Sequence, residues 1–548
     1  MAFLFSKIKA PTSDSVNKLR QFLHTIVEMP ERKDSIVTCI CNSLNKGLSW
    51  DSLTKEFSSV QFSNPIIQKV LLQLKEPSNA KKALNFFHWS AKQMDFQHGI
   101  YTYCITLHIL VKAKLVKDAK ALLERILMNP INSKGTDAMP EASVTAGCSE
   151  KGQECGISLE HDPLLLNILQ SLLDTYVIAD SIPFVFDLFM QTCAKLRMLD
   201  NILDACKLMD EHGFGLSVIS YNTILHVIQK SDKPFLVWDV YEHIIKKRMH
   251  PNEVTFGIMV SALRKEGKLV RYLNVVDRIH GKRCSSPGVV VNTCLVFQII
   301  EEGRIEDGLV LLKRLSQKNM ILDTVSLSLV IFAKLKMGNL DAAWEIYEGM
   351  CRRGFENNSF VITLFIEAYC KEGRIKEAIH LMQEMESMEL KPFEETFNHL
   401  IGGCTQVGDW EESLELCKRM INMGLLPSLL AFNKMVEMIS KKGDVKLADE
   451  LLTVLLDKGF TPDENTYSLL AAGYGRAGYV EGILKLYHEM KYRSLSPSAS
   501  IFCTLISCLC KHGRVREAEE YLLLMKAKSL KPHAYVYEAL VASHLEKG

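Results

Sequence analysis

The sequence predicts an all-α fold, a solenoid built from helix-turn-helix repeats of 35 residues. Eight glycines follow one another at this interval: Gly303, Gly338, Gly373, Gly408, Gly443, Gly478, Gly513 and Gly548. Five prolines keep the same interval in another phase: Pro392, Pro427, Pro462, Pro497 and Pro532. Such a period is typical of repeat arrays, in which each repeat buries its apolar face by stacking on its neighbours. We therefore expect the function to belong to the surface of the stack rather than to a single pocket.

The repeat over residues 359–393 shows why each period should hold two helices. Two runs of apolar residues recur at helical spacing, namely Ile362, Phe365, Ile366 and Tyr369, then Ile375, Ala378, Ile379, Leu381 and Met382. Gly373 lies between the runs, where a helix C-terminus favours a residue that tolerates positive φ. Pro392 ends the repeat, because proline cannot continue a helix interior. One position of the second helix holds small residues, which predicts close packing: Gly308, Ala343, Ala378, Ser413, Ala448 and Ala518, with Ile483 as the exception.

The same pattern divides the chain into segments. We expect a basic N-terminal segment over 1–35, a helical extension over 36–64, the first repeats over 65–128, a disordered insertion over 129–160 and a degenerate repeat over 161–182. The insertion is rich in Gly, Ser, Thr, Ala and Glu and lacks helical periodicity. Regular repeats fill 183–548 and begin at Pro183, Val218, Glu253, Val289, Thr324, Ser359, Glu394, Leu429, Glu464 and Ala499. The last repeat begins at Ala534 and is incomplete, which indicates either a truncated chain or a frayed natural end.

Residues 1–35 allow two interpretations. Basic residues outnumber the single early acid Asp14, and serines lie nearby: Lys7, Lys9, Lys18 and Arg20, with Ser6, Ser13 and Ser15. A basic, hydroxyl-rich segment that is poor in acids is compatible with an organellar transit peptide. An ordinary amphipathic helix fits these residues equally well.

Composition argues against several classes of site. The 16 cysteines form no CxxC pair and no Cys/His ligand spacing, so we expect neither disulfides nor a metal site. The formal net charge of +1 argues against indiscriminate binding of polyanions. No continuous apolar stretch is long enough to span a membrane. We expect no membrane association and no cofactor.

Short motifs at the repeat boundaries carry a resemblance to a known family. Repeats open with Thr396-Phe397-Asn398, Thr466-Tyr467-Ser468 and Ser220-Tyr221-Asn222, and close with Lys391-Pro392, Thr461-Pro462-Asp463 and Lys531-Pro532. Near the N-terminus stand Ala83-Leu84-Asn85-Phe86-Phe87-His88-Trp89, His98 and Tyr101-Thr102-Tyr103. Over roughly residues 65–548 these features resemble the P-type pentatricopeptide repeat (PPR) proteins of plant organelles. The resemblance implies a right-handed superhelix that binds single-stranded RNA in an organelle, the mitochondrion ahead of the chloroplast.

In that family the fifth residue of a repeat reads the base edge and the last residue assists, one base per repeat. The resemblance therefore assigns these pairs: Asn222 with Asn252 to a pyrimidine, Thr293 with Asp323 to guanine, Ser328 with Asn358 to adenine, Thr363 with Phe393 to a purine, Asn398 with Ser428 to cytosine and Asn433 with Asp463 to uracil. Ser468 with Ser498 is a weak pair, and Gly257, Cys503 and Asp187 give no assignment. From Val218 to Ser498 the expected target, 5′ to 3′, is pyrimidine, any base, G, A, purine, C, U, any base.

Two further series of residues support an RNA-facing groove. The second residue of a repeat should wedge between bases, a role that suits Ile219, Val254, Val290, Val325, Phe360 and Leu430 but not Glu395, Asn465 or Ser500. Cations recur near the end of successive first helices: Lys230, Lys265, Lys336, Lys371, Lys441, Arg476 and Lys511, a series that Glu301 and Gln406 interrupt. One cation per repeat would match one phosphate per nucleotide. For single residues, core packing of the apolar side chains and helix-end electrostatics of the cations are the alternatives.

No pattern in the sequence indicates an enzyme. The zinc deaminase pattern is missing, because no CxxC string accompanies an HxE, and there is no P-loop and no acidic cluster of a two-metal nuclease. We expect a monomeric binding protein that acts on organellar transcripts in processing, stability, splicing or translation, together with other RNA-processing factors. The alternative is a helical-repeat scaffold that binds proteins on its concave surface.

Overall fold

The computed structural model describes residues 31–93, 96–128, 164–280 and 286–545, and every regular element within these ranges is a helix. The chain forms two compact bodies, residues 1–269 and 270–548, which are described separately below. The residues assigned to the insertion (129–160) and most of the candidate transit peptide (1–30 of 1–35) lie outside the described ranges. Residues 31–35 belong to the first described helix.

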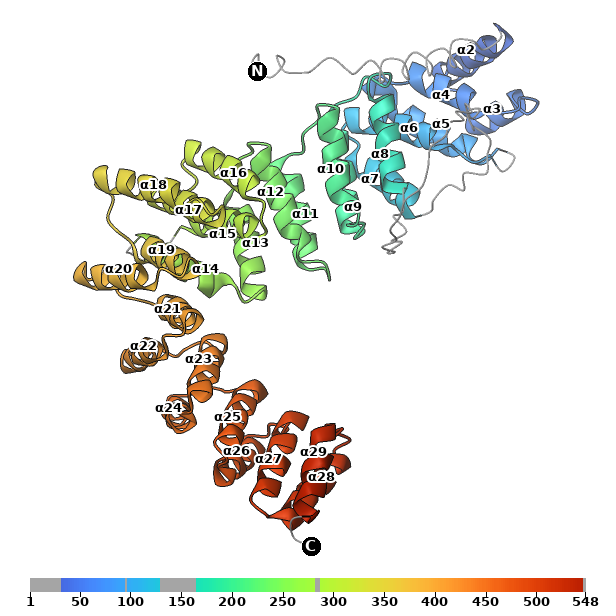
Figure 1. The fold of residues 1–548 in the computed structure, drawn as a ribbon. Helices are drawn as coiled ribbons and strands as arrows, with labels where there is room; N and C mark the ends of the chain where they lie inside the picture. The colour runs from blue at the N-terminus through green and yellow to red at the C-terminus, as the bar shows by residue number, and fades with distance from the viewer. Residues whose placement is uncertain (1–30, 94–95, 129–163, 281–285, 546–548) are drawn as a thin grey trace, which may run out of the picture. The chain divides into compact units, whose positions relative to one another are not determined.

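The N-terminal body consists of helices that pair and stack (Figure 1). They are α2 (Glu31–Asn45), α3 (Trp50–Glu56), α4 (Asn64–Gln73), the short 3₁₀ helix η1 (Pro77–Asn79), α5 (Ala80–Ser90), α6 (Ile100–Lys112), α7 (Val116–Met128), α8 (Leu164–Tyr176), α9 (Phe184–Lys195), α10 (Ile202–Glu211), α11 (Val218–Gln229), α12 (Leu236–Lys246) and α13 (Glu253–Lys265). The degenerate repeat contributes α8, which packs on α6, while α9 packs on both α7 and α11. The stacking of first helices is thus interrupted once, between α8 and α9.

The C-terminal body begins with α14 (Leu269–His280) and is a regular array of pairs. First helices are α15 (Pro287–Glu301), α17 (Asp323–Lys336), α19 (Ser359–Lys371), α21 (Glu394–Val407), α23 (Leu429–Lys442), α25 (Glu464–Arg476), α27 (Ala499–Lys511) and α29 (Ala534–Leu545). Second helices are α16 (Ile305–Gln317), α18 (Leu340–Arg352), α20 (Ile375–Ser387), α22 (Trp410–Asn422), α24 (Val445–Asp457), α26 (Val480–Tyr492) and α28 (Val515–Ala527). Each first helix packs on its own second helix and on the next first helix. The predicted all-α solenoid of helix-turn-helix repeats is confirmed.

Local chemistry explains where the helices end and how the pairs approach. Gly373 has φ +76° and Gly408, at the end of α21, has φ +84°, the left-handed region that glycine enters without strain. Ala378 is fully buried between its helix and the neighbours, as expected for the small-residue position. At the equivalent Gly308, an added Cβ would lie 2.8 Å from a carbon of Ile300. Ile483 is also fully buried, so that repeat accommodates the larger side chain.

Candidate nucleic-acid interface

The strongest geometric feature is a recurring contact between the fifth residue of a repeat and the last. Asn222 Nδ2 donates to Asn252 Oδ1 over 3.0 Å, and Asn433 Nδ2 donates to Asp463 Oδ1 over 3.2 Å. In each pair the second residue is the N-cap of the following first helix, α13 or α25, and its side chain accepts from a backbone N–H of that helix. The array therefore brings together residues thirty positions apart at every such junction.

A hydroxyl that the sequence analysis did not assign completes these junctions. Thr255 Oγ1 donates to Asn222 Oδ1 over 2.7 Å, and Thr466 Oγ1 donates to Asn433 Oδ1 over the same distance. Both hydroxyls are buried, so they fix which way the carboxamide of the fifth residue faces. The sequence carried a signal for them, because threonine recurs as the third residue of repeats, for example Thr396.

Three more predicted pairs meet in the structure. Asn358 Nδ2 donates to Ser328 Oγ over 3.3 Å, and the hydroxyls of Ser468 and Ser498 lie 3.2 Å apart. At the third pair, the Ser428 backbone N–H donates to Asn398 Oδ1 over 2.9 Å.

Two predicted pairs are arranged differently. Thr293 is fully buried and its hydroxyl donates to the Val289 carbonyl of its own helix, whereas Asp323 is exposed at the start of α17. Thr363 bonds the hydroxyl of Thr396 over 2.7 Å instead of contacting the Phe393 side chain. In these two repeats the fifth and last residues are not joined as they are at Asn433.

A pair in the N-terminal body has the same geometry and was not assigned from the sequence. Asp187, the fifth residue of its repeat, accepts from the Ser217 hydroxyl over 2.8 Å and from the Ser217 backbone N–H over 2.9 Å. It also accepts from the hydroxyl of Ser220, the third residue of the next repeat. The resemblance assigned no base to Asp187, so this pair was not among the predicted ones.

The apolar second residues fall into two groups. Ile219, Val254 and Leu430 are 59–70% exposed, as a side chain that wedges between bases must be. Val290, Val325 and Phe360 are at most 8% exposed. The covered group belongs to three consecutive repeats of the C-terminal body, which start with α15, α17 and α19.

Aromatic rings lie beside these covered residues. Phe297 and Phe332 are stacked with their ring centroids 4.5 Å apart, and Phe360 lies 6.3–6.5 Å from both. The Arg271 guanidinium of α14 lies 5.7 Å from the Phe297 ring and 3.2 Å from a Glu301 oxygen. These side chains therefore form an aromatic cluster, defined here as Phe297, Phe332 and Phe360, along α15, α17 and α19.

Glu395, one of the second residues that do not suit a role between bases, has a specific partner. Arg278 Nη1 of α14 lies 2.8 Å from its carboxylate, and the Arg278 guanidinium lies 3.8 Å from the centre of the Phe393 ring. An arginine over an aromatic face and beside a carboxylate is stabilised by both. The contact joins residues 117 positions apart in the sequence.

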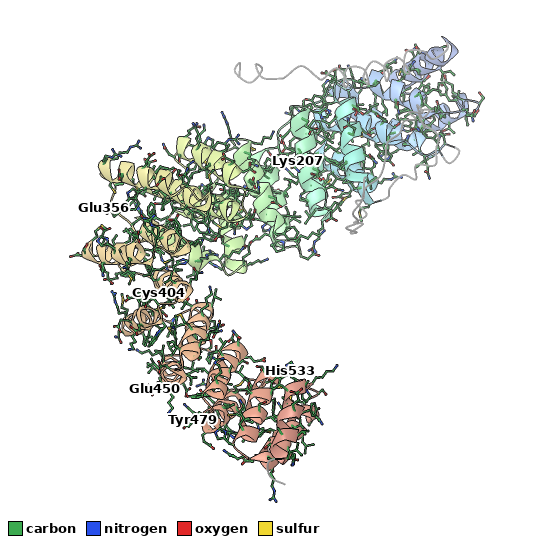
Figure 2. The ribbon with its side chains drawn as sticks, in the orientation of Figure 1. Lys207, Glu356, Cys404, Glu450, Tyr479 and His533 are labelled. Carbon is green, nitrogen blue, oxygen red and sulfur yellow. The ribbon has the colours of Figure 1, made fainter. Side chains whose placement is uncertain are left out.

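A cavity of about 930 Å³ opens beside this contact within the C-terminal body. Asn274 and Arg278 of α14 line one part of it, and Asn357, Asn358 and Phe393 line another. Glu356, labelled in Figure 2 in the loop between α18 and α19, also belongs to its wall. The lining combines polar and charged side chains with apolar ones, among them Ile279, Phe355 and Leu390.

The cation series is partly neutralised by neighbouring groups. Lys371 pairs with Glu367, Lys336 lies 4.0 Å from the same carboxylate, and Lys441 pairs with Glu437 at 2.7 Å. Lys265 donates to the Gln229 carbonyl over 2.7 Å. The remaining members of the series, Lys230, Arg476 and Lys511, are exposed. The series thus contributes charge to the first-helix face unevenly.

Two carboxyl groups of this face stay ionised. Burial raises the pKa of Glu367, but Lys371, His399 and Lys336 outweigh burial and hold it below the usual value. Burial likewise raises the pKa of Asp463, and hydrogen bonds from the Thr466 backbone and hydroxyl and from Asn433 more than offset it. Asp463 is therefore a hydrogen-bond acceptor at neutral pH.

Two kinds of feature are absent from the described residues. No helix among them is both long and apolar enough to cross a lipid bilayer. No group of three or more His, Cys, Asp or Glu side chains among them is arranged to hold a metal ion.

Comparison with known proteins gives matches along much of the array. A PPR repeat family model matches residues 216–265, PPR repeat models match 325–355, 361–390, 465–495 and 493–526, and a pentatricopeptide repeat domain model matches 380–442. The mitochondrial pentatricopeptide repeat-containing protein At1g66345 of Arabidopsis thaliana is 42% identical over 278 residues, which are 51% of this chain and 43% of that protein. A second mitochondrial protein of this kind, At1g11710 of Arabidopsis thaliana, is 23% identical over 45% of this chain and 33% of its own length.

The chain spans less than half the length of these two curated relatives. Among solved structures, the crystal structure of the pentatricopeptide repeat protein PPR10 from maize is similar at 17% identity, with a TM-score of 0.37 over 90% of this chain and 78% of that one.

Proposed function

Since the chain belongs to the pentatricopeptide repeat family, we propose that it binds single-stranded RNA in a sequence-specific manner, one base per repeat, on the face formed by its first helices. The observation that carries the proposal is the recurring junction of a fifth residue, a last residue and a third-residue hydroxyl, as at Asn433, Asp463 and Thr466. A scaffold that binds proteins has no reason to repeat this polar junction at a fixed interval.

The unused hydrogen-bonding groups of two junctions support their base assignments. Asn433 Oδ1 is occupied by Thr466 and one Nδ2 hydrogen by Asp463, so one N–H remains, together with the second carboxylate oxygen of Asp463. A donor next to an acceptor matches uracil, which offers a carbonyl beside its N3–H.

The junction of Asn398 and Ser428 leaves only hydrogen-bond donors free. Asn398 Oδ1 is occupied by the Ser428 backbone, and Ser428 Oγ accepts from the Ala431 N–H. Amide N–H and hydroxyl donors are what remain to face a base. Donors match cytosine, whose N3 and O2 are both acceptors, and this agrees with the assignment from the sequence.

The proposed mechanism is steric. RNA bound along the first helices would be withheld from base pairing and from nucleases, while other factors would carry out any chemistry on the transcript. We place the protein in mitochondria because its relatives at 42% and 23% identity are named as mitochondrial, and a fluorescent fusion tests this placement. Whether the protein acts in RNA processing, stability, splicing or translation depends on where its target lies in a transcript.

Selection from a random single-stranded RNA pool by the purified full chain, handled as a monomer, tests the function. The expected product contains G-A, then C-U one base later. A different enriched motif would contradict the assignment of repeats to bases, and no enrichment by folded protein would contradict RNA binding itself.

Protein binding on the same face is the second candidate, favoured by the exposed apolar residues Ile219, Val254 and Leu430. The salt dependence of affinity distinguishes RNA binding from protein binding. The logarithm of the RNA affinity falls with the logarithm of the salt concentration, with a slope of about −0.7 per phosphate contact.

A further inference from the structure

We propose that Arg278 is a latch: in the free protein it closes the first-helix face of the repeats that begin with α15, α17 and α19, and RNA reaches their reading residues only when the latch opens. The inference rests on the proposed RNA binding and adds a residue that controls access to the site. Arg278 lies on a second helix, α14, outside the three series of predicted RNA contacts.

The position of the latch explains what it closes. Arg278 is near the C-terminus of α14, whereas its partners Phe393 and Glu395 are the N-cap and second residue of α21. Helices α15 to α20 lie between them in the sequence. A contact between the two ends of this segment spans its three repeats, so those repeats cannot open fully while the contact holds.

The apolar second residues of the repeats within the span are covered, whereas Leu430, the next apolar second residue beyond it, is exposed. Thr293 and Ser328 have no exposed surface, and Phe360 is 8% exposed within the aromatic cluster. One repeat beyond Glu395, Leu430 is 67% exposed. A base cannot contact a fully buried hydroxyl, so reading by Thr293 and Ser328 requires a conformation other than the one seen.

The walls that the latch joins are separated by the 930 Å³ cavity rather than by a packed core. Arg278 reaches Glu395 at the edge of this cavity, and the Glu395 side chain is 55% exposed. Releasing one arginine therefore removes the direct contact between the two walls, and an exposed ion pair with a cation–π contact is a weak one.

Affinity measurement on the full chain tests the latch. Arg278→Ala removes a positive charge, which by itself weakens RNA binding. If closure competes with binding, the variant instead binds an RNA containing the G-A-purine-C-U tract about tenfold more tightly, because a larger fraction of the protein is open. Arg304→Ala is the matched control: it removes the same charge from a residue that pairs with Asp307 at 2.8 Å, away from the latch.

Hydroxyl-radical labelling with mass spectrometry tests the closure without RNA. Phe332 and Phe360 should be oxidised more readily in Arg278→Ala than in the parent or in Arg304→Ala. Glu395→Gln is a second variant that keeps the Phe393 contact, and we expect a smaller change in the same direction for both readouts.

The outcomes separate the latch from the proposed function. Unchanged labelling, or RNA affinity that falls in Arg278→Ala as it does in Arg304→Ala, overturns the latch even while the parent binds RNA. Increased labelling with no RNA binding by any of the proteins overturns the role of the latch in RNA access together with the proposed function, although the closure itself would be established.

Discussion

Asn433 and Asp463 are thirty residues apart in the sequence, and their side chains form a hydrogen bond of 3.2 Å at the junction of α23 and α25. The bond leaves an N–H on one residue and a carboxylate oxygen on the other. In the proposed binding mode these two groups set the hydrogen-bonding pattern that a base has to match, so changing one of them should change the preferred base.

Exchanging the last residues of two repeats should exchange their base preferences. In Asp463→Ser the carboxylate acceptor is replaced by a hydroxyl, and we expect the preference at that position to move from uracil to cytosine. In Ser428→Asp the preference should move from cytosine to uracil. Discrimination of about 1–3 kcal/mol per well-matched contact corresponds to roughly tenfold or more in affinity.

A panel of four RNAs that differ at one position measures each variant. Both new residues are good helix N-caps, so neither α23 nor α25 should lose stability. Each variant is the control for the other, because only its own position in the RNA should respond. Loss of affinity for all four bases alike would show that the last residue supports the helix without reading the base.

The buried hydroxyl of Thr466 should be needed for the preference of its repeat. Thr466→Val keeps the shape of the side chain but leaves Asn433 Oδ1 without its donor, at a cost of about 1–3 kcal/mol in unfolding free energy. The carboxamide is then free to turn over, so we expect the uracil preference to weaken toward that of a non-specific position. Thr453→Val on the second helix α24, where the hydroxyl bonds its own helix, is the control and should change neither quantity.

The sequence predicted the array and several contacts between fifth and last residues because both repeat with the period. The positive φ at Gly373 and the contact between Asn433 and Asp463 recur from repeat to repeat and so leave a regular signal. The burial of Thr293 and Ser328 leaves no periodic signal in the sequence. It accompanies a single contact between Arg278 and Glu395 across three repeats, and one pair of residues 117 positions apart has no periodic signature.

The pairing of Glu437 with Lys441 should limit the positive charge available to RNA. The two side chains lie 2.7 Å apart on α23, and Glu437→Gln removes the partner while leaving the lysine in place. We expect RNA affinity to rise a few-fold at low salt and the dependence on salt to steepen by about 0.7 on logarithmic axes, the value for one additional phosphate contact.

Glu415→Gln is the control for the change in net charge, because Glu415 is exposed on the second helix α22. An equal effect of the two substitutions would show that Lys441 acts through the overall field and makes no phosphate contact.

The N-terminal body should lose stability in mild acid through His108. Its ring is fully buried between α6 and α8, where Nδ1 lies 2.7 Å from the Ser181 hydroxyl and Nε2 lies 3.1 Å from the Leu172 carbonyl. Burial lowers the pKa of His108 to about 4, despite the opposing hydrogen bond to Leu172. The unfolded chain binds the proton near pH 6.5 and the folded chain does not, so stability is complete above pH 6.5 and falls between pH 6.5 and 4.

Over that interval the single group should cost about 3 kcal/mol. Hydrogen exchange followed at pH 7.0 and 5.0, with rates corrected for the intrinsic effect of pH, would show α6 and α8 losing protection while α23 and α25 keep theirs. His108→Gln should reduce this difference although it lowers stability at both values, and the remainder is due to His98, whose pKa burial also lowers to about 4. Substitution of the exposed His250 should leave the difference intact. Equal loss of protection in both bodies would indicate that the acid response is general and not due to His108.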